Sequence, residues 1–384
     1  MQRLTRALGL LDGGVVIATA FLVAVGVVML YSTTAPLALG ERIPPHFLRQ
    51  LGAVAVALVA AASALAVPTP AWRRLAWPGW LFGVALLVAT AFAGDDVNGA
   101  RRWLTIPGVG VAFQPGELAK WATLLAVAAQ LGRAREQGRL SPRRLAPCAA
   151  LVGVPTLFFL LQPDLGSAVV LVALAGLLVF VAGAPLRLFA VPGALGAAAV
   201  LLYVVVNDYA RRRITGFLDP WATASNEGFQ LVQSFVAFGR GGLLGEGIGD
   251  GRQKLFYLPE AHTDFILSVV AEETGLVGVC LVLGAFAALA IAGLRIALRA
   301  RDSFAMLLAV AMTALVTVPA LLNAAVVMGV VPTKGLTLPF LSYGRTSFVV
   351  SFLAVGILLG IGRREGRAPA PKIARAERRR SWTR

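Results

Sequence analysis

Ten apolar stretches, each long enough to form a membrane helix, follow one another along this chain and constrain its fold more than any other feature. A helix of about 20 apolar residues can cross the hydrocarbon core of a bilayer. The sequence is 58% hydrophobic with a mean hydropathy of +0.78, more than a soluble domain with a polar surface can hide. We therefore predict an all-α polytopic membrane protein with about ten transmembrane helices, near residues 13–32, 47–67, 75–94, 115–131, 146–162, 165–183, 187–206, 264–294, 303–328 and 344–362.

The basic residues between these stretches predict the orientation. With the N-terminus in the cytoplasm, most of the 35 Lys and Arg residues fall in the inner connections and the C-terminal tail, as the positive-inside rule requires. Both termini are therefore predicted to be cytoplasmic. Residues 1–362 are expected to form one integral membrane domain, and the basic tail 363–384 is expected to be disordered and to lie against anionic membrane lipids. The net charge of +16 is thus the charge pattern of a membrane protein and does not indicate nucleic acid as a partner.

One extracytoplasmic loop, about 207–263, is longer than any other connection, and loops of this length are usually functional or disordered. Aromatic and apolar residues at helical spacing from Phe229 to Phe238 predict a short amphipathic helix within it. The two cysteines, Cys148 and Cys280, lie inside apolar stretches, so the sequence supports neither a disulfide framework nor a metal site with cysteine ligands.

The stretch from Tyr257 to Gly278 carries the main candidate site. Glu260, His262 and Asp264 stand directly before an apolar stretch, in a chain that has only two histidines. The structural interpretation is a helix start, with Thr263 as its cap and Asp264 in its first turn. The functional interpretation is a polar stripe that descends from Asp264 through Ser268 and Glu272 into the membrane, where acidic residues are rare and functional.

Two further motifs place charge near the same face. In Gln114-Pro-Gly-Glu-Leu-Ala-Lys120, the residues Glu117 and Lys120 share one side of a helix, and we expect an intramembrane ion pair that either holds helices together or borders a site. In Asn98-Gly-Ala-Arg-Arg-Trp103, a turn precedes Arg101 and Arg102. These arginines are either interfacial anchors or a clamp for phosphate oxygens, which fit the guanidinium fork.

Seven motifs follow one another in order and lie on one predicted membrane face. They are Asn98-Gly-Ala-Arg-Arg-Trp103, Gln114-Pro-Gly-Glu117, Gln162-Pro-Asp-Leu-Gly166, Arg213-Ile-Thr-Gly-Phe-Leu-Asp-Pro-Trp221, Gly241-Gly-Leu-Leu-Gly245, Leu258-Pro-Glu-Ala-His-Thr-Asp-Phe-Ile266 and Leu338-Pro-Phe-Leu-Ser-Tyr-Gly344. In this order the motifs resemble the SEDS family of FtsW, RodA and SpoVE. The resemblance covers about 98–347 and leans to the division and sporulation members. Gly116, Ala210 and Arg345-Thr346 depart from the family pattern.

The resemblance implies a peptidoglycan glycosyltransferase of the bacterial cytoplasmic membrane that polymerises lipid II on the outer face, with a class B penicillin-binding protein as partner. It places the essential carboxylate on Asp264, which we predict to be the general base of an inverting transfer, with His262 as the rival base and Glu260 in support. For the pyrophosphate and substrate we predict Arg101, Arg102, Arg213, Lys254, Lys334, Gln114 and Ser342.

Three questions stay open at this stage. The sequence demands no metal, although a divalent cation held with Asp264 is compatible with it. A lipid II flippase is the alternative function, because Glu117, Lys120 and Glu272 could accompany a polar head group across the membrane. A third possible function is that of a scaffold that only recruits the penicillin-binding protein.

Overall fold

The computed structural model of the chain describes residues 12–37, 43–97, 100–106, 108, 111–138 and 140–365. Asn98 and most of the predicted tail, from residue 366 onward, lie outside this range. Ten helices of the described part coincide with the ten predicted membrane segments. They are α2 (Gly13–Thr34), α3 (Pro45–Ala66), α4 (Thr69–Ala93), α5 (Pro115–Glu136), α6 (Pro142–Leu161), α7 (Leu165–Val181), α8 (Arg187–Val206), α11 (Ile266–Arg299), α12 (Ser303–Val327) and α13 (Arg345–Glu365).

Eight of these helices, all except α5 and α7, are long and apolar enough to cross a bilayer. α7 has only 17 residues, and α5 carries Glu117 in its first turn and two arginines in its last. Membrane crossing by these two helices therefore stays a prediction. The all-α polytopic fold is confirmed.

Local chemistry explains where several helices begin. Proline opens α3, α5 and α6, where its missing N–H group costs no hydrogen bond. Side-chain oxygens of Asp12, Asp164 and Asp302 accept backbone N–H groups at the starts of α2, α7 and α12. The apolar stretches are thus divided into helices by caps and prolines that the sequence already contains.

The connection between α4 and α5 forms a small antiparallel sheet that was not predicted. Its strands are β1 (Asp95–Val97), β2 (Ala100–Ile106) and β3 (Val111–Phe113), in the order β1-β2-β3. Asp96 pairs with Arg101, and Leu104 with Phe113. The outer strands have three residues each, too short to give a recognisable alternation in the sequence.

The long loop of 207–263 is ordered around two helices and a short π-helical turn. α10 (Phe229–Gly241) confirms the predicted short helix, and its buried face includes Leu231, Val232 and Ala237. α9 (Asp208–Leu218) was not predicted; it starts at Asn207, whose side chain caps it. The turn η2 (Gln253–Tyr257) then leads into the stretch that contains Asp264.

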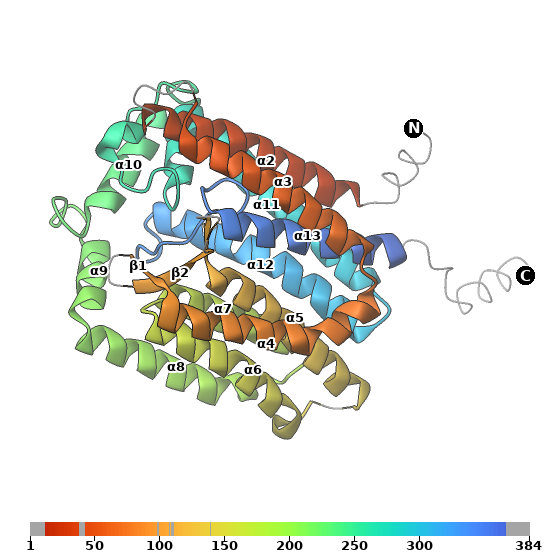
Figure 1. The fold of residues 1–384 in the computed structure, drawn as a ribbon. Coiled ribbons are helices and arrows are strands. Elements are labelled where there is room, and N and C mark those ends of the chain that lie inside the picture. The colour runs from red at the N-terminus through yellow and green to blue at the C-terminus, as the bar shows by residue number, and fades with distance from the viewer. Residues whose placement is uncertain are drawn as a thin grey trace, which may run out of the picture.

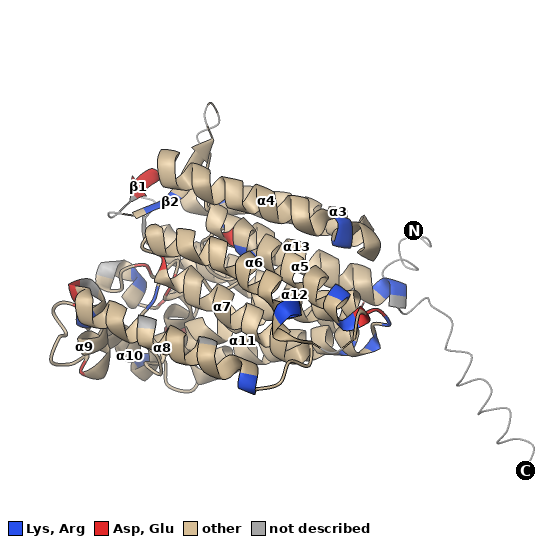
Figure 2. Cartoon of the chain, turned by 90° about the horizontal axis from the view of Figure 1, so that it is seen from below, with Lys and Arg blue, Asp and Glu red and all other residues tan. Residues whose placement is uncertain are grey.

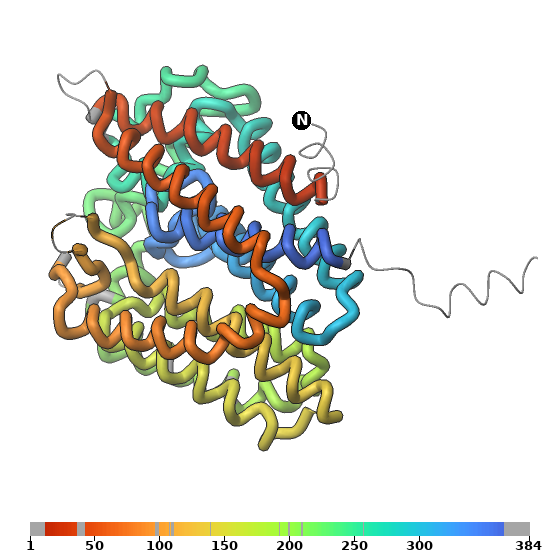
Figure 3. The backbone as a smooth tube through the Cα atoms, turned by 45° about the vertical axis from the view of Figure 1, so that its right-hand side comes forward, coloured from red at the N-terminus to blue at the C-terminus, as the bar shows by residue number. Residues whose placement is uncertain are grey.

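The helices lie roughly along one direction, with α5 and α12 in the interior (Figure 1). α2 and α3 form one side and α4 to α7 the other, while α13 packs against α3 (Figure 3). The pair α3/α13 is closely packed, since a Cβ at Gly356 would lie 2.3 Å from the carbonyl oxygen of Ala61. α8 carries no buried residue in its most apolar window and packs mainly on α9.

The chain enters α2 and leaves α13 at the same end of the bundle, while the sheet, α9 and α10 lie at the opposite end (Figure 1). Lys and Arg residues gather at the end where the chain enters and leaves (Figure 2). The first and last described residues, 12 and 365, therefore lie at one end of the bundle, as the predicted topology requires. We call the end with the sheet the outer end, following that prediction.

α11 is broken at Gly275, which has φ +67°. Its first part, 266–274, is therefore separate from the apolar part that follows. Glu272, in the first part, accepts hydrogen bonds from the backbone N–H groups of Arg252 and Gln253. The predicted stripe from Asp264 through Glu272 into the membrane is wrong, because Glu272 faces the outer loop and binds its backbone.

Candidate active site

The segment that carries Asp264 is not the first turn of a helix. α11 begins at Ile266, and its N-cap residue, Phe265, makes no side-chain capping bond. The Thr263 hydroxyl donates instead to the carboxylate of Glu260, at 2.6 Å. The helix-cap interpretation of Thr263 and Asp264 is therefore wrong, and the carboxylate of Asp264 has no capping role.

Three consecutive carbonyl groups hold this segment in place. The carbonyl oxygen of His262 accepts from the Tyr343 N–H at 2.8 Å, and that of Thr263 accepts from the Ser342 hydroxyl at 2.5 Å. The carbonyl oxygen of Asp264 accepts from the Asn323 amide at 2.7 Å. Each donor lies in α12 or in the connection between α12 and α13. The backbone around Asp264 is therefore held by residues that are distant in the sequence.

Ser342 and Asn323 thus act on the backbone of the site. The Ser342 hydroxyl also accepts from the Leu338 N–H at 2.7 Å. Its hydrogen bonds are therefore made within the protein and not to a substrate. Asn323 is fully buried and donates a second bond to the Leu336 carbonyl at 2.5 Å. Sequence reasoning missed Asn323, although an asparagine inside the apolar stretch 303–328 was a visible signal.

The carboxylate of Asp264 lies in a tight, largely buried position. A Cβ on Gly335 would stand 2.8 Å from its Oδ2 atom, so only glycine fits there without displacing the carboxylate. Burial raises the pKa of Asp264 to about 7; the neighbouring Glu260 raises it further, and Arg213 opposes the rise. Near neutral pH this group can therefore take up and release a proton.

A group of cations stands around Lys334, close to Asp264. Burial lowers the pKa of Lys334 to about 8; Asp164 opposes this effect, while Arg213, Lys120 and Arg102 lower the pKa further. The Lys334 side chain lies over Gly166, where a Cβ would be 2.5 Å from its Cε atom. Four cations from different elements thus converge, and we call Arg102, Lys120, Arg213 and Lys334 the cation group.

Backbone contacts position the arginines of this group. Arg213 donates to the carbonyl oxygen of Thr333 at 3.0 Å. Arg102 donates to the carbonyl oxygens of Gln162, at 3.2 Å, and of Pro163. Asp164, which caps α7 through two bonds to Ser167, is the acidic neighbour of Lys334 that sequence reasoning did not place in the site.

The predicted pair of Glu117 and Lys120 is present, with 2.8 Å between its charged atoms and both side chains largely buried. Through Lys120, which also lowers the pKa of Lys334, this ion pair adds Glu117 to the surroundings of the cation group. Gln114 lies at the start of α5, where its backbone N–H donates to the Thr346 hydroxyl at 2.9 Å. Thr346, a departure from the family pattern, thus joins the starts of α5 and α13.

Two predicted substrate cations lie elsewhere. Arg101 is exposed on β2, opposite Asp96 of β1 in the strand register, whereas its neighbour Arg102 is partly buried. Lys254 is buried and its ammonium donates to the Ser32 hydroxyl, the Gly249 carbonyl and the Glu273 carboxylate, at 2.7, 2.5 and 2.6 Å. These three bonds use all of its donors, so we assign Lys254 a structural role.

Replacing Lys254 by Met is expected to destabilise the protein by about 3–5 kcal/mol, because Glu273 would keep a buried charge without its cation. Thermal unfolding of the purified protein in detergent measures this loss. The double variant with Lys254→Met and Glu273→Gln should recover part of it. Equal melting temperatures for Lys254→Met and the unaltered protein would contradict the structural assignment.

The only two histidines of the chain meet beside the site. The rings of His46 and His262 have centroids 5.8 Å apart, and Tyr343 contacts both, at 5.3 and 5.8 Å. Burial lowers the pKa of His262; Glu260 opposes this, and His46 adds to it. His262 is therefore a neutral ring near pH 7. His46, at the start of α3, was not predicted as a neighbour.

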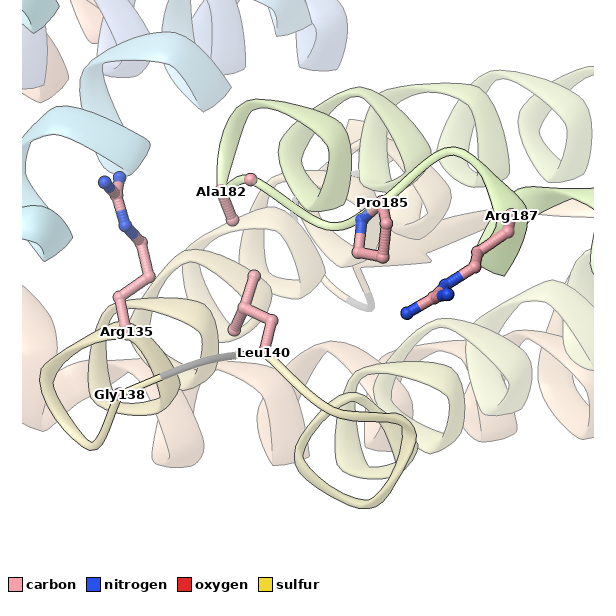
Figure 4. Close-up of a pocket in the computed structure, with 7 residues that line it drawn as sticks. Arg135, Gly138, Leu140, Ala182, Pro185 and Arg187 are labelled. Atoms are coloured by element: carbon pink, nitrogen blue, oxygen red, sulfur yellow. The ribbon is translucent and has the colours of Figure 1, made fainter.

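Among the described residues, no group of three or more His, Cys, Asp or Glu side chains is arranged to hold a metal ion. A pocket of about 400 Å³ lies at the other end of the bundle, between the α5–α6 and α7–α8 connections, and includes Arg135, Leu140 and Arg187 (Figure 4). It is remote from Asp264, at the end of α5 opposite to Glu117.

Fold and site together define a polytopic membrane protein with a buried carboxylate and a cation group at one end of its helix bundle. The sequence profile of the cell cycle protein family FtsW/RodA/SpoVE matches residues 14–366, and the chain belongs to this family. A probable peptidoglycan glycosyltransferase FtsW of Geobacter sulfurreducens is 41% identical over 350 residues, 90% of this chain and 93% of the relative. A protein of the same name from Coxiella burnetii is 38% identical over 361 residues, 91% and 95% of the two chains.

Solved structures show the same fold. One chain, from work on the structural coordination of polymerization and crosslinking by a peptidoglycan synthase complex, matches with a TM-score of 0.76 and 32% identity. The match covers 93% of this chain and 99% of that chain. The rod shape determining protein RodA of Thermus thermophilus matches with a TM-score of 0.68 and 29% identity, over 94% and 98% of the two chains.

Proposed function

We propose that this protein is a peptidoglycan glycosyltransferase that polymerises lipid II into glycan strands, the activity for which its relatives are named. The observation that carries the proposal is the Asp264 carboxylate, which has a pKa of about 7 and stands near Arg213 of the cation group. Three hydrogen bonds, one to each carbonyl group of residues 262–264, fix the backbone of the segment that carries it. A base whose pKa lies near the working pH is the kind that proton transfer in catalysis requires.

In the proposed reaction, a sugar hydroxyl of one lipid II molecule attacks the anomeric carbon of another. The bond from that carbon to the pyrophosphate breaks, and its electron pair leaves with the pyrophosphate. Asp264 takes the proton of the attacking hydroxyl. Attack opposite to the leaving group inverts the anomeric carbon and needs one positioned base and no covalent intermediate.

The leaving pyrophosphate gains negative charge as the bond breaks, so cations placed beside it stabilise the transition state. Lys334, Arg213 and Arg102 are the residues that we assign to this role. Lys120 adds positive charge while its pairing with Glu117 keeps it in place. A divalent cation could join Asp264 and the substrate phosphates, but the described residues supply no complete set of ligands for it.

We place the reaction on the outer face of the bacterial cytoplasmic membrane, with both termini in the cytoplasm. A class B penicillin-binding protein is the proposed partner, since a structural neighbour comes from a complex that couples polymerization to crosslinking. The FtsW names of the relatives favour a role in division over elongation. Residues 1–362 would form the membrane domain and 363–384 a basic tail, whose first three residues continue α13.

Labelled lipid II is incubated with the purified full-length protein, either alone or in complex with its penicillin-binding protein. We expect glycan ladders on gels. The alternative, a lipid II flippase, predicts instead that labelled lipid moves between the leaflets of protein-containing vesicles without forming polymer. A scaffold yields neither result, and either of these outcomes would overturn the proposal.

The rate of polymerisation should show a bell-shaped dependence on pH. Below pH 7 Asp264 becomes protonated and cannot accept a proton, and above pH 8 Lys334 loses its charge, so kcat/KM should be highest between about pH 7 and 8. In the variant Lys334→Arg the alkaline decrease should move out of range, because arginine stays charged, while the acidic limb remains. An acidic limb that is absent down to about pH 5.5 would show that Asp264 is not the base.

A further inference from the structure

An exposed apolar turn follows α10 on the outer loop. We call residues 242–249 the dileucine turn. Leu243, Leu244 and Ile248 are 70%, 81% and 64% exposed within it. Gly242 and Gly245 adopt φ values of +49° and +83°, which reverse the chain and turn the two leucines outward. Single exposed apolar residues are ordinary, but three within six residues of a loop form a patch that needs a partner.

Hydrogen bonds place this turn at the outer end of the membrane-spanning part of α11. Leu276 and Val277, the first residues after the break at Gly275, donate their N–H groups to the carbonyl oxygens of Gly242 and Leu243, at 2.9 and 3.2 Å. Leu276 and Val277 are themselves about half exposed, as residues that face lipid are. The dileucine turn thus continues the exposed apolar surface of α11.

Contacts of a second helix, α2, place the dileucine turn at the same depth in the membrane. Ser32, in the last turn of α2, donates to Glu273 at 2.7 Å, just before the break in α11. Its neighbour Tyr31 is half exposed, and tyrosine is enriched at membrane interfaces. The dileucine turn is therefore level with the outer ends of two spanning helices and not above them in water.

Much of its backbone is already hydrogen-bonded to the protein. The N–H groups of Gly245, Glu246 and Gly247 donate to the carbonyl oxygens of Gly241, Glu272 and Glu273. With the carbonyls of Gly242 and Leu243 also bonded, the turn can enter lipid without leaving these polar groups unsatisfied. Arg240 and Glu246, 3.5 Å apart, stand beside the leucines as the polar boundary.

We propose that the dileucine turn inserts into the surrounding leaflet at the boundary between headgroups and acyl chains. The side chains of Leu243, Leu244 and Ile248 anchor the outer loop to the bilayer surface. The turn lies between α10 and η2, so the anchor also restrains the chain that leads to Asp264. This proposal does not depend on the catalytic role of Asp264.

Site-directed spin labelling tests the proposal on the full chain in lipid nanodiscs. Cys148 is buried, so the label attaches to the exposed Cys280 of α11 in the unaltered protein. The label at Cys280 serves as the reference for a lipid-facing position. In a Cys280→Ser background, Leu244→Cys carries the test label and Asp250→Cys, in the polar part of the same loop, the water reference. Collision rates with oxygen and with a water-soluble nickel complex are compared by power saturation.

We expect the label at position 244 to collide with oxygen several-fold more than with the nickel complex, as at Cys280, and the label at 250 to show the reverse. A label at 244 that behaves like the one at 250 would overturn the proposal. So would low collision rates with both reagents, because they would mean that a second copy of the chain covers the turn. Intact helix content by circular dichroism excludes misfolding as the cause of either result.

Discussion

Replacing Asp264 by Asn should lower the rate of glycan polymerisation by about 10²- to 10⁴-fold, the range that a positioned base contributes. The amide has nearly the same volume as the carboxyl group and keeps the backbone bond to Asn323, so the fold should persist. It cannot accept the proton of the attacking hydroxyl. Initial rates with labelled lipid II measure the effect, and the apparent KM should change far less than kcat.

Glu260→Gln is the matched control. Glu260 is exposed, and its carboxylate is bonded to Thr263, so its loss should cost little beyond a lower pKa at Asp264. The rival base is His262, which is neutral and two residues away. Should His262→Ala abolish polymerisation while Asp264→Asn leaves it nearly intact, the base would be His262 and not Asp264.

The sequence indicates which charged residues lie near one another, because these charges stand at the ends of helices that share one face. Asp264, Arg213, Lys334 and Arg102 were all expected at the outer end, and the structure brings them together there. Helix positions were predictable for the same reason, since hydrophobic length decides where a membrane helix lies. Neither inference needed knowledge of tertiary contacts.

Where tertiary contacts decide, prediction from the sequence failed. Arg101 and Arg102 are equivalent in sequence, but alternation along β2 turns only Arg102 toward the bundle. Lys254 was expected at the substrate, yet it pairs with Glu273, whose contact with the loop depends on the break at Gly275. Asn323 and His46 join the site only through contacts between distant segments.

Replacing Lys334 by Met should reduce polymerisation by about 100- to 1,000-fold, the loss typical when one preorganised group that stabilises transition-state charge is removed. Lys334 is influenced by the charge of Asp164, and it directly precedes Gly335, whose backbone packs against the Asp264 carboxylate. Lys334→Arg keeps the charge and should retain more activity than Lys334→Met. Rates with the same labelled lipid II, at saturating concentration, measure both.

The two neighbouring arginines provide a matched comparison for the same argument. Arg102→Met should lower the rate, since Arg102 belongs to the cation group, whereas Arg101→Met should leave it close to that of the unaltered protein because its side chain is exposed on the other side of β2. Equal losses for both would mean that the charge of the strand acts at long range and not by contact with the leaving group. Equal retention by both, together with an active Lys334→Met variant, would remove the cation group from the mechanism and leave Asp264 to act without it.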